Sequence, residues 1–316
     1  MSRQNTDRRI IGGRPSKKSE RLNNRKHIVI LTIILALILI FVYVSGIFIP
    51  EEAVKGSFLN AKCPPGMKHI FGTDALGRDV FLRTLKGLSV SLTVGIAASI
   101  ISAVIAVFVG IAAAAGAKWI DTIVNWVIDL VMSVPHTILI ILISFALGRG
   151  LKGLLVGIAA THWCSLARLI RAEVLQLRSQ QYIEVSRRLG KSGGWILINH
   201  LLPHLVPQFF VGLVLMLPHA ILHEASISFL GFGLPPEQSA IGIILAESMR
   251  YLSTGMWWTA VLPGITLVLI VLLVDKLGDN LRMILDPYSA QKWLDKPYIY
   301  SRTIIYLWRS YSNIEE

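Results

Sequence analysis

Long apolar stretches with few or no charged residues alternate with polar segments along most of the chain. A helix needs about 20 apolar residues to cross the roughly 30 Å hydrocarbon core of a bilayer, and these stretches reach or exceed that length. The pattern therefore predicts an all-α polytopic membrane protein with six transmembrane helices. The predicted spans are residues 28–50, 90–117, 120–147, 153–175, 205–230 and 259–277.

The polar segments divide the chain into five predicted parts. A basic tail precedes the first span, and a loop of mixed polarity follows it. A five-helix core then contains one amphipathic, basic loop and one Gly- and Pro-rich loop, and a polar tail comes last. In order, these are the tail 1–27, the helix 28–50, the loop 51–88, the core 89–282 with its loops 176–203 and 231–258, and the tail 283–316.

Composition and charge agree with a membrane protein. The chain is 53% hydrophobic and only 16% charged, which is unusual for a soluble domain. Its net charge of +12 lies between the apolar stretches, so it favours contact with anionic lipid over nucleic-acid binding. Most Lys and Arg lie on segments that share a side with the N-terminus, which predicts a multi-pass cell-membrane protein with both termini in the cytoplasm.

Residues 181–190 predict a short amphipathic helix on the cytoplasmic side. Tyr182, Val185 and Leu189 recur at helical spacing and form a small apolar face. Gly190 is placed to end the helix and turn the chain. Such a helix is suited to insertion into a groove of a soluble partner.

This segment resembles the EAA loop of ABC importer permeases. That loop has a Glu-small-small triplet, a glycine four residues later and Leu-Pro near its end; here Val185 replaces the usual second residue of the triplet. The resemblance implies that the loop docks into the ATPase subunit and transmits its motion. The residues assigned to this role are Tyr182, Glu184, Val185, Ser186, Arg187, Gly190, Leu202 and Pro203.

Four other segments are similar to the C-type permeases of dipeptide, oligopeptide and nickel importers. In the first of them, Thr73 or Asp74 is expected to cap the helix that follows. In the second, Trp126 lies where an arginine is usual. The segments are residues 71–81, 126–135, 228–236 and 278–287, and the resemblance covers about residues 28–287. Residues 288–316 have no recognised counterpart.

The resemblance implies a type I ABC importer permease fold and a set of partners. These are a second permease subunit in a heterodimer, two ATPase subunits that bind ATP and Mg²⁺, and an extracytoplasmic solute-binding protein. We expect no cofactor and no enzyme activity in this chain itself. Gly190-Lys191-Ser192 resembles the end of a phosphate-binding loop, but Val185 replaces its leading glycine and no strand precedes it. The main alternative is an ion-gradient-driven secondary transporter.

Ionisable residues inside the predicted spans are candidates for the translocation pathway, because their burial in lipid is costly. His219 and His223 share a helix face and could contact a borderline divalent metal ion, whereas the adjacent Glu224 points away from them. Ordinary packing between helices is the alternative, and pairing within the bundle is favoured for Asp129. The candidates are Asp129, His162, His219, His223 and Glu224. His162, His219 and His223 also resemble positions of nickel-importer C subunits, so the cargo is either nickel, free or chelated, or di- and oligopeptides.

Overall fold

A computed structural model describes the backbone of residues 17–285 and the side chains from residue 26 onward. The described residues form helices and loops, with a single isolated bridge between Thr73 and Asp79 and no strand. In order, the helices are α1 (Lys17–Phe48), α2 (Val80–Ala115), α3 (Lys118–Ser133), α4 (His136–Ala146), α5 (Gly150–Arg178), α6 (Gln181–Arg188), α7 (Gly193–Ile196), the π-helical turn η3 (Leu197–Leu201), α8 (Leu202–Phe229), α9 (Ile241–Met249) and α10 (Trp258–Leu285). Short 3₁₀ turns lie at Glu51–Val54, Phe58–Asn60 and Leu252–Thr254.

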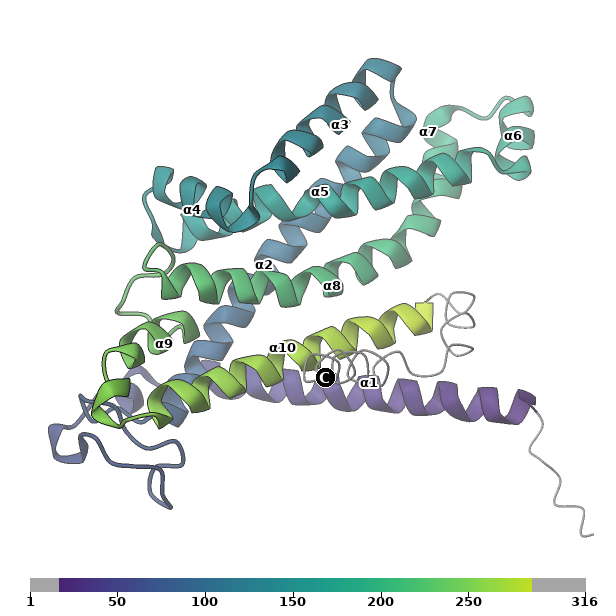
Figure 1. The fold of residues 1–316 in the computed structure, drawn as a ribbon. Coiled ribbons are helices and arrows are strands. Elements are labelled where there is room, and N and C mark those ends of the chain that lie inside the picture. Colours follow the sequence, from purple (N-terminus) through teal and green to yellow (C-terminus); the bar gives the residue numbers. More distant parts are fainter. Residues whose placement is uncertain (1–16, 286–316) are drawn as a thin grey trace, which may run out of the picture.

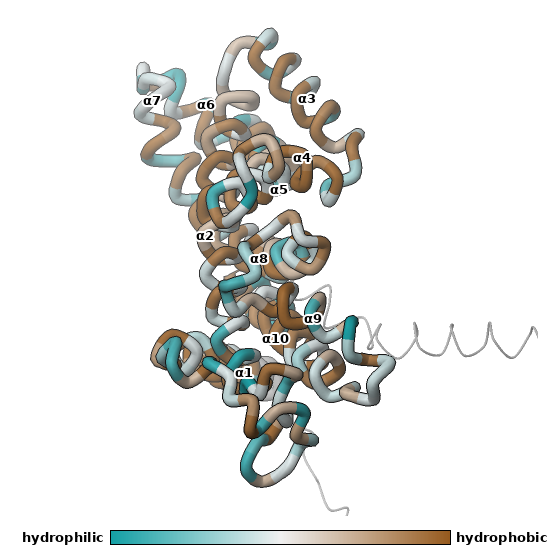
Figure 2. The backbone as a smooth tube through the Cα atoms, turned by 90° about the vertical axis from the view of Figure 1, so that its left-hand side faces the viewer, coloured by the Kyte–Doolittle hydropathy of each residue, from teal (hydrophilic) through white to brown (hydrophobic). Residues whose placement is uncertain are grey.

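The predicted all-α membrane fold is confirmed. Five described helical segments are long and apolar enough to span a bilayer, and the bent pair α3–α4 supplies a sixth. Figure 1 shows α6, α7, the start of α1 and the end of α10 at one end of the bundle. The loop before α2 and the helix α9 lie at the opposite end. Figure 2 shows apolar residues along the helices and more polar residues in the loops.

The third predicted span, residues 120–147, is not one continuous helix. It breaks into α3 and α4, whose axes differ by 96°. Pro135 explains the break, because it lacks a backbone N–H and disfavours helical geometry at the residue before it. Val134 accordingly has an extended ψ of 136°.

Several helices extend beyond their predicted bounds. α2 begins at Val80 because the carboxylate of Asp79 accepts a hydrogen bond from the Leu82 N–H at 3.0 Å. The expected cap at Thr73 or Asp74 is therefore wrong. α1 begins at Lys17, inside the predicted basic tail, and α9 lies within the predicted loop 231–258. The rest of that tail, the end of the 278–287 segment and most of the tail 283–316 lie outside the described residues.

α2 crosses the middle of the bundle and contacts α1, α3, α5 and α8. Small residues allow this close packing. A Cβ added to Gly110 would lie only 2.8 Å from the carbonyl oxygen of Ala167 on α5. One added to Gly95 would lie 2.8 Å from Ile221 on α8. α1 lies at the edge of the bundle and exposes apolar residues such as Ile33, Leu37 and Phe41, as expected of a lipid-facing helix.

Candidate functional site

The predicted coupling loop forms the helix α6 and two turns that lead into α8. One residue, Ile183, anchors α6 to the bundle: it is 0% exposed and packs in a core cluster with Val174, Ile196 and Leu201. Ile183 is not part of the predicted apolar face, which consists of Tyr182, Val185 and Leu189. Those three side chains are instead 40%, 54% and 75% exposed.

A large apolar side chain exposed on a polar loop is a candidate contact for a protein partner. The α6 helix therefore has two apolar sides, one attached to its own subunit and one free to dock. A cavity of about 300 Å³ lies beside α6 and is lined by Arg178, Ser179, Glu184, Arg187 and Arg188. Glu184 accepts a hydrogen bond from Arg188 at 2.5 Å, so the glutamate and arginine stiffen the helix surface.

Gly190 ends the α6 turn in the left-handed region, with φ of +78°. A Cβ at this position would meet no atom within 4 Å. The requirement for glycine is therefore conformational and does not come from close packing. Leu202 and Pro203 start α8 and are both exposed.

Two ion pairs join α3 to α5. Asp129 pairs with Arg168, which confirms the expected pairing of Asp129 within the bundle. Asp121 accepts from Nε and Nη2 of Arg171 at 2.6 and 2.7 Å. Asp129 and Arg168 are 68% and 43% exposed, and charged groups that faced lipid would be strongly unfavourable. This part of α3 and α5 therefore faces a protein partner or an aqueous passage.

Three histidines from three helices meet inside the bundle. The ring centroids of His162 on α5 and His223 on α8 are 5.1 Å apart. His136, at the first position of α4, lies 5.9 Å from His162 and 6.5 Å from His223. His136 is not among the predicted site residues. It directly follows Pro135, where the third predicted span breaks.

The predicted metal pair is not assembled into a larger ligand set. His219 is exposed one turn before His223, and its Nδ1 lies 3.3 Å from the carbonyl oxygen of Leu215. Nδ1 of His162 lies 3.0 Å from the carbonyl oxygen of Ile158. Among the described residues, no group of three or more His, Cys, Asp or Glu side chains is arranged to hold a metal ion.

Glu224 directly follows His223, but its side chain is fully buried. It is 0% exposed, and its Oε1 accepts a hydrogen bond from the Ser228 hydroxyl at 2.9 Å. The Ser228 oxygen in turn accepts from the Leu234 N–H at 3.2 Å, which ties the end of α8 to the loop that follows it. Glu224 is therefore enclosed within this subunit.

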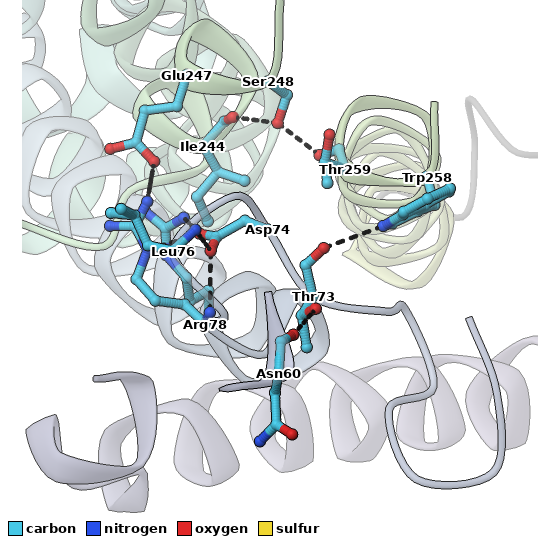
Figure 3. A network of polar contacts seen from close by, with 11 residues as sticks. Asn60, Thr73, Asp74, Leu76, Arg78, Ile244, Glu247, Ser248, Trp258 and Thr259 are labelled. Atoms are coloured by element: carbon cyan, nitrogen blue, oxygen red, sulfur yellow. Dashed lines mark hydrogen bonds and ion pairs between the residues drawn. The ribbon is translucent and has the colours of Figure 1, made fainter. Parts of the chain in front are cut away.

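A charged network at the opposite end of the bundle was not foreseen. Oδ2 of Asp74 accepts from Arg78 at 2.6 Å and from Arg83 at 2.9 Å. Both arginines also donate to Oε2 of Glu247 on α9, at 2.7 and 3.0 Å. Figure 3 shows Asp74 and Arg78 facing Glu247 and, nearby, the Trp258 indole donating to the carbonyl oxygen of Thr73. The 71–81 segment therefore joins the loop before α2 to α9 and α10.

The helical bundle and its amphipathic loop together define the membrane subunit of an ABC importer. Residues 106–287 match the family model described as "Binding-protein-dependent transport system inner membrane component", and the chain belongs to this family. It is thus a multi-pass permease subunit rather than an enzyme. Family membership also rules out the ion-gradient-driven secondary transporter.

Similar proteins agree with this assignment. The dipeptide transport system permease protein DppC of Bacillus subtilis is 33% identical over 254 residues, which is 79% of each chain. A Brucella suis protein named as a peptide transport system permease is 38% identical over 224 residues, or 71% of this chain and 75% of that protein. A chain in an inward-facing structure of the MetNI methionine ABC transporter shares the fold, with a TM-score of 0.54 and 20% identity over 65% of this chain and 96% of that one. The predicted type I permease fold is confirmed.

Proposed function

We propose that this chain carries di- and oligopeptides, delivered by an extracytoplasmic solute-binding protein, across the cell membrane. The proposal rests on relatives that are named as peptide or dipeptide permeases. They are 33–38% identical to this chain over most of its length. The chain pairs with a second permease subunit, and two ATPase subunits bind and hydrolyse ATP with Mg²⁺ on the cytoplasmic side. Both termini lie on that side, as the distribution of basic residues supports.

The mechanism is alternating access driven from the coupling loop. ATP-driven closure of the ATPase subunits moves α6 through its exposed residues Tyr182, Val185 and Leu189. Because Ile183 is buried in the bundle, α6 moves the cytoplasmic ends of α5 and α8 with it. The passage then opens on alternate sides of the membrane.

The histidines can contact a peptide in the passage through hydrogen bonds. Neutral imidazoles donate and accept hydrogen bonds, which suits the amide and carboxylate groups of a peptide in transit. We assign His162, His219 and His223 to the passage and add His136, whose ring lies beside two of them. We assign the buried Glu224 a structural role beside the passage.

Nickel, free or chelated, is the second candidate cargo. The observation that favours it is the same meeting of His136, His162 and His223, because imidazole is a good ligand for Ni²⁺. A passage needs only brief contacts with its cargo, so a fixed set of ligands is not required.

The test is uptake in cells with and without this chain. Radiolabelled dipeptide and radiolabelled Ni²⁺ are each supplied with the other, unlabelled, as competitor. We expect chain-dependent dipeptide uptake that excess Ni²⁺ does not reduce. Chain-dependent Ni²⁺ uptake that ignores dipeptide, and that falls in the His219→Ala, His223→Ala double variant, would assign nickel instead.

A further inference from the structure

The coupling helix and the transmembrane helix α8 are joined by a π-helical turn. In η3 the N–H of Leu202 donates to the carbonyl oxygen of Leu197, five residues earlier. Pro203 favours this wider turn, because it has no N–H to donate to the carbonyl of Asn199. Single π-helical turns are rare and often occur at functional positions. The Leu-Pro pair of the loop thus creates a specific local geometry.

This turn directs His200 back toward α6. Its Nε2 lies 3.1 Å from the hydroxyl oxygen of Ser186, and its ring centroid is 5.6 Å from that of Tyr182 and 5.2 Å from that of Trp195. Lys191 covers the other part of this cluster, with its Nζ 4.8 Å from the Trp195 ring centroid. His200 is therefore flanked by Tyr182, Ser186 and Trp195, although it belongs to the turn that leads into α8.

The hydrogen bond requires a polar atom at His200. The Ser186 hydroxyl has one proton and two acceptors within reach, the carbonyl oxygen of Tyr182 at 2.9 Å and Nε2 of His200 at 3.1 Å. When the proton goes to Tyr182, Nε2 of His200 donates to the Ser186 oxygen; in the other tautomer of His200, Nε2 accepts the Ser186 proton. A side chain with an N–H in the same place could maintain the contact, whereas an apolar one could not.

We propose that His200 is a positioning residue that transmits the movement of α6 to α8. The inference rests on the proposed function of α6 as the ATPase contact. Ile183 holds α6 against the bundle through apolar packing, and the hydrogen bond to His200 adds a directional contact that fixes the position of α6 along its own axis. The same α8 helix carries His219 and His223, so a displacement at its start reaches the passage.

The test compares ATP hydrolysis with uptake in the complete reconstituted transporter. The variants are His200→Leu, His200→Gln and Ser186→Ala, with Asn199→Ala as the control. Asn199 belongs to the same turn, but it is exposed and its amide donates only to the Trp195 carbonyl at 2.9 Å. For His200→Leu we expect normal assembly, near-normal ATP hydrolysis and about fivefold less cargo moved per ATP, as the loss of one hydrogen bond predicts.

A conservative variant and a double variant test whether the lost hydrogen bond between Ser186 and His200 causes the reduced uptake per ATP. His200→Gln retains an N–H and should recover most of the uptake per ATP. Ser186→Ala should behave like His200→Leu, and the double variant should be no worse than either single variant. Unchanged uptake per ATP in Ser186→Ala, additive losses in the double variant, or equal loss of ATP hydrolysis and uptake would overturn the proposal. If His200→Leu does not assemble, the uptake per ATP of Ser186→Ala alone tests the proposal. If the wild-type complex hydrolyses ATP and moves no peptide, the proposed cargo fails and the ratio is measured with Ni²⁺.

Discussion

Arg83 and Glu247 are 164 residues apart in the sequence, yet Nη2 of Arg83 lies 3.0 Å from Oε2 of Glu247. The Arg83 side chain is only 5% exposed and also binds Asp74. Its charge is therefore satisfied from two separate segments, the loop before α2 and the helix α9. Arg83 therefore links the loop before α2 to the helix α9.

Arg83→Met should destabilise the subunit by about 3 kcal/mol, because removing one partner from a buried ion pair leaves the other charges unmatched. Thermal unfolding of the detergent-solubilised complex measures the effect. Lys55→Met is the matched control, since Lys55 pairs with Glu52 where both are well exposed, and such pairs contribute little. Equal melting temperatures for Arg83→Met and wild type would contradict a structural role for the network.

Gly190→Val should abolish uptake while leaving membrane insertion intact. A β-branched residue is strained at φ of +78°, so the turn that orients α6 would change its shape. Gly193→Val serves as the control, because that glycine also has open space around it but lies at the start of α7 without a positive φ. Uptake assays in membrane vesicles with matched protein levels give the answer. Normal uptake by Gly190→Val would remove the conformational argument.

Two apolar residues of the coupling loop should respond differently to alanine. Ile183→Ala creates a cavity in the core and should lower stability by about 3 kcal/mol. Leu189→Ala removes an exposed side chain, so stability should stay unchanged while association with the ATPase subunits weakens by about fivefold. Melting temperature and pull-down of the ATPase subunits separate the two effects. Identical behaviour of the two variants would disprove the two-sided helix.

Glu224→Gln should preserve both stability and uptake. Its amide oxygen can still accept from the Ser228 hydroxyl, which is what the buried carboxylate oxygen does now. Glu224→Lys should prevent folding, because a cation there would be buried without a partner. Expression level and uptake of the two variants provide the measurement. A selective loss of uptake in a well-folded Glu224→Gln variant would return Glu224 to the translocation pathway.

The sequence predicted the fold class because apolar runs of bilayer length have few other solutions. It also predicted the helix α6, from the spacing of Tyr182, Val185 and Leu189. It did not predict which apolar residue faces inward: Ile183 was missed, since the choice depends on α5 and α8 packing against it. The meeting of His136 with His162 and the pairing of Arg83 with Glu247 join distant segments, and local periodicity contains no information about such contacts.

The pairing of Asp129 with Arg168 yields the last prediction. Arg168→Ala leaves the Asp129 carboxylate without its partner, and Asp129→Ala leaves the Arg168 guanidinium without its partner. An unmatched charge within membrane-spanning segments is unfavourable, so each single variant should lower the amount of folded protein. The double variant removes both charges and should recover much of that loss if the pair serves packing alone. If the charges also contact solute, the double variant should instead fold well and transport poorly. Folded yield, measured by gel filtration, and uptake at equal protein level distinguish these cases. Additive losses of folded protein in the double variant would show that the two residues do not act as a pair.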